Sequence, residues 1–217
     1  MSSFPQHLLE GYRTFTSQRL PTEQSRYREL SERGQSPEVM VIGCCDSRVS
    51  PEVIFDAGPG ELFVVRNVAN LVPVYQPDGG AHGVSAALEY AVQVLHVKHI
   101  VVLGHAQCGG IRAFIDNMAP LSPGDFIGKW MSMFIKPGEK VAQRDHETMQ
   151  DFTTRIEKAA VFRSLESLMT FPCVQILAER GRLHLHGAYF GVAEGSLSVL
   201  DQAAKEFRSV RQTQASS

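Results

Sequence analysis

Two short apolar segments, about sixty residues apart, each end in a glycine followed by side chains that bind metals or carry charge. Residues 39–48 read VMVIGCCDSR, and residues 100–108 read IVVLGHAQC. A short apolar segment rich in β-branched residues predicts a buried strand, and the glycine after it predicts a tight turn. Because parallel strands deliver the residues that follow them to one edge of a sheet, we expect the metal-binding residues of both segments to lie together. These residues are Cys44, His105 and Cys108, with Asp46 and Arg48 beside them.

The order of elements around these segments predicts the fold class. After the strand at Val39–Ile42, Ser50-Pro51-Glu52 has the composition of a helix start, and Leu62–Val65 is a second apolar segment. Apolar residues then repeat at helical spacing from Gly83 to Leu95, and a further strand follows at Ile100–Leu103. Alternating strands and helices are typical of an α/β protein with a mostly parallel central sheet and flanking helices.

The two ends of the chain depart from this alternation. Residues 1–36 are polar and predict a helical arm, with helices near Leu8–Gln18 and Glu23–Glu32. Residues 183–190 and 197–200 alternate apolar and polar positions, which predicts a C-terminal antiparallel hairpin. We therefore interpret residues 1–217 as a single domain whose first 36 residues form an arm too small to have a core of its own.

The part of the chain between the third strand and the hairpin has a weaker pattern. It predicts a helix from Ile111 to about Asn117, one or two helices within residues 145–170, and a strand at Val174–Leu177. Residues 118–140 are expected to be irregular apart from an apolar patch at Phe126–Phe134. The tail from Asp201 onward predicts a short helix.

Charge and cysteine content limit the classes of function. A formal charge of −2 gives no electrostatic reason to expect nucleic acid or a membrane surface as a partner. The start of the chain lacks the pattern of a secretion signal, and no apolar segment approaches the length that spans a bilayer. Three of the four cysteines lie in the two glycine-containing segments, which is more typical of metal ligands in a reducing compartment than of disulfides. We expect a cytoplasmic protein.

Zinc is the metal that these ligands favour. Two cysteines and one histidine, with a fourth position left for water, form a recognised catalytic set. The two thiolates cancel the charge of Zn²⁺, so its bound water is only weakly acidic and a nearby group must stabilise the hydroxide form. Asp46 and Arg48 point the same way in extended chain, so they can pair. We expect Arg48 to keep Asp46 ionised and able to accept a hydrogen bond from the hydroxide; unpaired, Asp46 would take the fourth position itself.

The same residues allow two other interpretations. Cys44, His105 and Cys108 could form a structural zinc site, or the cysteines could simply be buried thiols, although structural sites usually have paired short spacings and need no adjacent Asp-x-Arg. A non-catalytic, zinc-stabilised interaction module is therefore a remote alternative. The remaining cysteines and histidines are expected to serve packing or to lie at the surface or in the hairpin, among them Cys45, Cys173, His99, His184 and His186.

Four sequence features together resemble one enzyme family. They are Cys44-x-Asp46-x-Arg48, His105-x-x-Cys108, the segment GELFVVRNVANLVP at residues 60–73, and LEYAV at residues 88–92. The chain closely resembles a β-class carbonic anhydrase of the plant-type subgroup. The resemblance extends from about Gly34 to Gly110 and, more weakly, to the final hairpin.

The resemblance implies a reaction and a set of residues. It implies reversible hydration of carbon dioxide to bicarbonate and a proton, by attack of zinc-bound hydroxide, with one Zn²⁺ per subunit. The family's zinc ligands fall on Cys44, His105 and Cys108, and its Asp–Arg pair falls on Asp46 and Arg48. Its substrate-pocket residues fall on Gln35, Phe63, Val68, Tyr90 and Gly109. It also implies a homodimer or a higher multiple, with residues 1–36 packed on the partner subunit and active sites at the interface.

One substitution and one rival reaction qualify the resemblance. Val41 stands where a bicarbonate-regulated subgroup has tryptophan, which argues against that regulation. Hydrolysis of carbonyl sulfide or carbon disulfide on the same scaffold is an alternative reaction, because the metal ligands would be the same.

Overall fold

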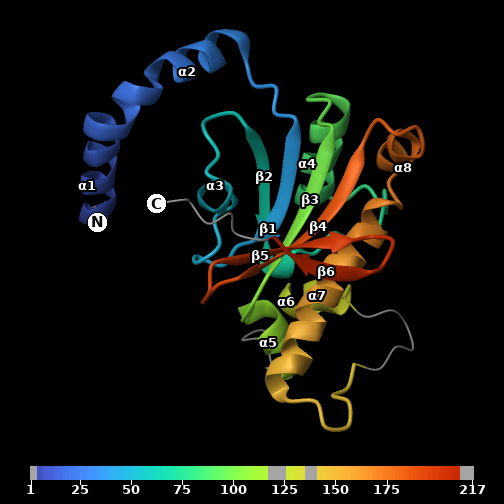
Figure 1. The fold of residues 1–217 in the computed structure, drawn as a ribbon. Coiled ribbons are helices and arrows are strands. Elements are labelled where there is room, and N and C mark those ends of the chain that lie inside the picture. Colours follow the sequence, from blue (N-terminus) through green and yellow to red (C-terminus); the bar gives the residue numbers. More distant parts are fainter. Residues whose placement is uncertain (1–3, 117–125, 135–140, 211–217) are drawn as a thin grey trace.

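A six-stranded sheet forms the centre of the computed structural model, which describes residues 4–116, 126–134 and 141–210 (Figure 1). The strands lie in the order β2-β1-β3-β4-β5-β6; the first four are parallel, and β5 and β6 are each antiparallel to the strand before them. Their bounds are Val39–Cys44 (β1), Leu62–Asn67 (β2), His99–His105 (β3), His184–Gly191 (β4), Ser196–Asp201 (β5) and Glu206–Ser209 (β6). The predicted α/β class and the mostly parallel sheet are confirmed.

Helices pack on both faces of the parallel strands. On one face, α4 (Gly83–Gln93), α7 (Met149–Leu168) and α8 (Pro172–Glu179) enclose the main core with alternate residues of β1 and β3. On the other face, α3 (Pro51–Ile54) contributes to a smaller apolar cluster. None of the described helices is long and apolar enough to cross a membrane.

A third group of helices lies beyond the carboxyl ends of the strands. It consists of α5 (Gly109–Ile115), α6 (Ile127–Ser132) and the first half of α7, and Figure 1 shows it below the sheet. Its apolar residues pack around Cys44 and Cys108. The predicted helix from Ile111 is thus present and ends at Ile115, whereas Asn117 lies outside the described residues.

The N-terminal segment is helical, as predicted for the arm. It contains α1 (Gln6–Thr14), a π-helical segment (Phe15–Arg19) and α2 (Leu20–Arg33), and none of these helical residues is buried. Figure 1 shows this arm projecting away from the sheet and joining it at β1. Large apolar side chains such as Phe4 and Tyr12 are 63% and 64% exposed on it, so a single chain leaves its apolar surface uncovered.

Two elements differ from the sequence-based prediction. Residues 174–177 are not a strand but part of α8, because Pro172 begins a helix and places Val174 and Leu177 on one core-facing side. The fourth parallel strand is instead β4, the first strand of the predicted hairpin. The tail after Asp201 is not a helix: the Asp201 carboxylate accepts hydrogen bonds from the N–H groups of Ala203 and Ala204, and this turn returns the chain as β6.

The register of the parallel strands brings the two polar turns together. Gly43 of β1 pairs with Leu103 of β3, so Cys44 ends β1 where His105 ends β3. Cys44 also pairs with Asn67, the last residue of β2. The turns that leave all three strands therefore meet at one edge of the sheet, beside α5 and α7.

Candidate metal centre

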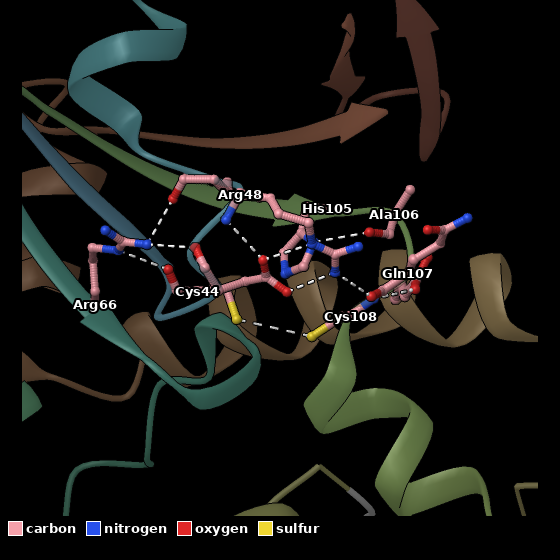
Figure 2. Close-up of polar contacts among 10 residues, drawn as sticks. Cys44, Arg48, Arg66, His105, Ala106, Gln107 and Cys108 are labelled. Carbon is pink, nitrogen blue, oxygen red and sulfur yellow. Dashed lines mark hydrogen bonds and ion pairs between the residues drawn. The ribbon is translucent and has the colours of Figure 1, made fainter. Parts of the chain in front are cut away.

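Three buried ligand atoms converge at this edge of the sheet. Cys44, His105 and Cys108 each offer one atom, and the three atoms lie within 4.8 Å of one another. The two sulfur atoms are 3.9 Å apart, and the three residues are 5%, 1% and 2% exposed (Figure 2). Within the described ranges, no other set of three His, Cys, Asp or Glu residues is arranged this way. The structure thus brings the three predicted ligands together.

The His105 ring shows that a metal ion fits here. Its Nδ1 lies 2.9 Å from the carbonyl oxygen of Ala106, so Nδ1 carries the hydrogen and donates it. That tautomer leaves a lone pair on Nε2, which is buried without a hydrogen-bond partner. A buried acceptor without a donor is costly, and a cation bound between the imidazole and the two sulfurs satisfies it. The donor set of two thiolates and one imidazole is one that zinc prefers.

The two cysteine side chains influence each other. The hydrogen bond between their sulfur atoms lowers the pKa of Cys44, whereas the same bond and burial raise the pKa of Cys108. Because zinc binds thiolates, a dication between the sulfurs would displace the proton of Cys108, which couples metal binding to proton release.

Asp46 and Arg48 form the expected ion pair next to this cluster. Arg48 Nε donates to Asp46 Oδ1 at 2.9 Å and Nη2 donates to Oδ2 at 2.7 Å, a bidentate geometry. The Arg48 N–H also donates to Oδ1 at 3.0 Å. The Arg48 guanidinium is the main cause that holds the pKa of Asp46 far below its usual range. Asp46 is therefore ionised at neutral pH, and its side chain is held toward Arg48.

Arg66, at the end of β2, fixes the turn that carries Cys44 and Asp46. Its Nε donates to the Cys44 carbonyl oxygen at 2.8 Å. Its Nη2 donates to the carbonyl oxygens of Asp46 and Val49 at 2.6 and 2.8 Å (Figure 2). This role was not predicted, although an arginine at the carboxyl end of the strand beside β1 is a signal that reasoning from register could have used.

The turn that carries Cys108 is held by the side chains of Arg48 and Glu157. Gln107 has a positive φ of 55°, uncommon for a residue other than glycine. Its carbonyl oxygen accepts from Arg48 Nη2 at 2.9 Å, and the Cys108 N–H donates to Glu157 Oε1 at 2.9 Å. Glu157 is 2% exposed, and its Oε2 accepts from the Tyr189 hydroxyl at 2.6 Å. Neither Glu157 nor Tyr189 was predicted as a site residue.

Two of the five predicted pocket residues lie beside the cluster. Val68 follows β2 and packs with the apolar group around Cys44 and Cys108, and its carbonyl oxygen accepts from Trp130 Nε1 at 2.8 Å. Gly109 follows Cys108 directly and faces open space, since a Cβ built there has no neighbour within 4 Å.

The other three predicted pocket residues lie toward the amino ends of the strands, away from the metal centre. Phe63 pairs with Met40, four residues before Cys44, which is about 13 Å along the strand. Tyr90 is 44% exposed, with its ring 6.0 Å from that of Phe63. Gln35 precedes β1 and is exposed. A single chain therefore does not form the expected apolar pocket of Phe63, Val68 and Tyr90.

The remaining cysteines and histidines lie outside this centre. Cys45 is exposed, and Cys173 packs partly buried against the main core. Three other histidines of β3 and β4 gather on one face of the sheet, where His99 Nδ1 lies 3.1 Å from His186 Nε2 and the His99 ring stacks on His184.

Comparison with known protein sequences gives consistent matches. The profile of a family described as carbonic anhydrase matches residues 39–197. A carbonic anhydrase of Pseudomonas aeruginosa is 36% identical over 203 residues, which cover 94% of this chain and 90% of that protein. Beta carbonic anhydrase 3 of Arabidopsis thaliana is 33% identical over 198 residues, covering 89% of this chain and 76% of that protein.

Solved structures with the same fold agree with these matches. The β-carbonic anhydrase CcaA has a TM-score of 0.83 at 27% identity, over 95% of this chain and 92% of its own. A tetrameric β-carbonic anhydrase from Sordaria macrospora has a TM-score of 0.74 at 29% identity, over 90% and 96% of the two chains. A carbon disulfide hydrolase covers 91% of this chain and all of its own, with a TM-score of 0.51 at 17% identity, which is a likeness of fold alone.

Proposed function

Because this chain belongs to the β-class carbonic anhydrases, we propose that it hydrates carbon dioxide reversibly to bicarbonate and a proton, with one zinc ion held by Cys44, His105 and Cys108. Members of this family are carbonate dehydratases. The observation that carries the proposal is the convergence of two thiols and a free imidazole nitrogen within 4.8 Å, next to an ionised Asp46. Bound zinc would supply a Lewis acid that makes water a nucleophile at neutral pH.

The residues of the chain then orient the reactants. Asp46 is ionised and accepts a hydrogen bond from the attacking water, which fixes the direction of its lone pair. Arg48 occupies both carboxylate oxygens of Asp46, and this keeps the carboxylate from taking the position that the nucleophile needs. Val68 contributes an apolar wall beside Cys108, suited to a small substrate without a net dipole.

We propose that the pocket is completed by a second subunit. Gln35, Phe63 and Tyr90 match the family's pocket residues but lie at the far edge of their own sheet, so they can line only the site of a partner. The uncovered arm at residues 1–36 supports a homodimer in which the arm packs on the partner, and the Sordaria macrospora relatives are tetrameric. All four cysteines are free, which supports a reducing compartment, the cytoplasm.

The alternatives have less support. A structural zinc site in an interaction module would have four protein ligands, whereas the described residues supply three. The carbon disulfide hydrolase shares only the fold, so it favours neither that reaction nor the hydrolysis of carbonyl sulfide. Rates measured side by side on carbon dioxide and carbonyl sulfide would separate these activities.

Two substitutions test the proposal. We expect Cys108→Ser to lose zinc and activity together, because it removes a ligand. We expect Asp46→Asn to keep zinc and lose most of its turnover, by about a hundredfold or more, since the acceptor for the nucleophile is gone. Stopped-flow hydration of carbon dioxide, with zinc quantified in the same samples, measures both. Full hydration activity in Asp46→Asn would contradict the role of Asp46.

A further inference from the structure

One peptide group, between Gln107 and Cys108, is held from both sides by charged side chains. Its carbonyl oxygen accepts from Arg48 Nη2 at 2.9 Å, and its N–H donates to Glu157 Oε1 at 2.9 Å. The same Arg48 nitrogen donates its other hydrogen to Asp46 Oδ2. Figure 2 shows Arg48 between the Cys44 turn and the Gln107 carbonyl. This peptide therefore links the Asp46–Arg48 pair to the backbone of a metal ligand.

The orientation of this peptide is not one that the local sequence favours. Gln107 has φ 55°, and a side chain in the left-handed region costs about 1–2 kcal/mol. Turning the Gln107–Cys108 peptide over, by rotation about ψ of Gln107 and φ of Cys108, would leave this φ unchanged. It would point the carbonyl oxygen at Glu157 and the N–H at the Arg48 guanidinium, and both hydrogen bonds would be lost. The Arg48 donor on one side and the Glu157 acceptor on the other thus select one of two orientations.

Burial and a hydrogen bond from Tyr189 hold the Glu157 side chain in this position. It lies in the middle of α7, 2% exposed, and its second oxygen accepts from Tyr189 Oη at 2.6 Å. Tyr189 is itself 8% exposed on β4. Within the described residues Glu157 forms no ion pair, so its hydrogen bonds to the Cys108 N–H and the Tyr189 hydroxyl account for its place in the interior.

We propose that Glu157 is a positioning residue of the metal centre, which fixes the Gln107–Cys108 peptide and thereby aims the Cys108 sulfur and seats Arg48 against Asp46. Its effect on zinc affinity follows from the ligand geometry, and its effect on turnover rests on the proposed function. What matters is the acceptor oxygen. Glu157→Gln keeps an oxygen toward the Cys108 N–H, whereas Glu157→Met fills similar volume and has none.

The test is the zinc affinity of the full chain, measured by competition with a chelator. We expect Glu157→Met to bind zinc about tenfold to hundredfold more weakly, the usual effect of losing a partner behind a metal ligand. We expect the zinc affinity of Glu157→Gln to stay within about threefold of that of the original protein, a smaller loss than the lower end of that range. Ser164→Ala is the matched control: Ser164 is 1% exposed on the same helix and bonds the backbone at Asn70 and Val72, so its loss should lower stability and leave zinc affinity unchanged.

Three results would overturn the proposal. They are unchanged zinc affinity in a folded Glu157→Met, an equal loss in Glu157→Gln, or an equal loss in Ser164→Ala. If Glu157→Met does not fold, Tyr189→Phe replaces it: removing the hydroxyl that anchors Glu157 should weaken zinc binding severalfold, and unchanged affinity would again overturn the proposal. Chelator competition does not require turnover, so a chain that binds zinc but hydrates no carbon dioxide would contradict the proposed function and leave this inference standing.

Discussion

The two glycines after Cys108 differ in the space around them, and this difference predicts different tolerance. A Cβ at Gly110 would lie 2.6 Å from Val68 Cγ1, whereas a Cβ at Gly109 would meet nothing within 4 Å. We expect Gly110→Ala to lower the free energy of unfolding by about 1–3 kcal/mol, because it forces apart α5 and the turn after β2. Gly109→Ala should cost less than about 0.5 kcal/mol. Urea unfolding of the two variants compares them directly, and equal losses would contradict the packing described.

Arg66 gives a second prediction for single residues. Replacing it with methionine removes the side-chain donor of the Cys44 and Val49 carbonyls and leaves the Asp46 carbonyl with the Val49 N–H alone. We expect Arg66→Met to lower the free energy of unfolding by about 1–3 kcal/mol. Arg66→Lys should recover only part of this, since an ammonium group cannot reproduce the planar fork. Chemical unfolding of the zinc-loaded variants measures both, and a full recovery by lysine would show that charge alone is needed.

Sequence reasoning identifies the residues of the site only when they share a segment with the ligands. Cys44, Asp46 and Arg48 follow one strand and His105 and Cys108 another, so strand order alone predicts that they meet. Arg66, Glu157 and Tyr189 come from three other elements. Arg66 and Glu157 bind the backbone of the turns, and Tyr189 binds the Glu157 carboxylate. Their roles in the site depend on tertiary packing, which no local sequence pattern predicts.

Among the elements, β1 to β5 and the long helices could be predicted from sequence patterns, whereas residues 172–177 and the tail after Asp201 could not. Four apolar residues within 172–177 fit a strand or a buried helix equally well, and Pro172 settles the matter by starting α8. The prediction for the tail after Asp201 was wrong for a related reason. Asp201 caps a tight turn with two hydrogen bonds, and a turn of that kind produced β6 where a helix was expected.

The histidine cluster on the paired strands β3 and β4 predicts a pH dependence of stability. Burial, followed by electrostatic repulsion from the neighbouring imidazoles of His99 and His184, lowers the pKa of His186. The unfolded chain therefore binds a proton at His186 more readily than the folded chain, and this contribution to stability is complete above pH of about 6.5 and is lost as the pH falls below it.

We expect His186→Gln to lose less thermal stability than the original protein between pH 7.5 and pH 5, a window that brackets the unfolded pKa of about 6.5. Thermal unfolding of both proteins across this range measures the difference. Protonation of the zinc ligands affects both proteins equally, so it cancels in the comparison. Parallel pH curves would show that His186 does not contribute.

For the whole molecule, the position of Tyr90 at the far edge of its own sheet predicts that subunits share active sites. Asp46→Asn impairs a subunit's own site, whereas Tyr90→Ala would impair the site of its partner. When the two variants are refolded together, half of the dimers are mixed, and each mixed dimer holds one site in which both residues are intact. We expect about a quarter of the original activity from two weakly active parents. Activity no higher than the mean of the parents would place Tyr90 outside the site.

The placement of Tyr90 beside Phe63, away from the metal centre of its own chain, has a further consequence. If two copies share the site as proposed, the rate depends on the fraction of chains that are paired. Dilution then acts as an inhibitor, and turnover per zinc ion falls once the protein is scarcer than its own dissociation constant. A cell could lower this activity simply by making less of the protein, and the loss would be steeper than proportional.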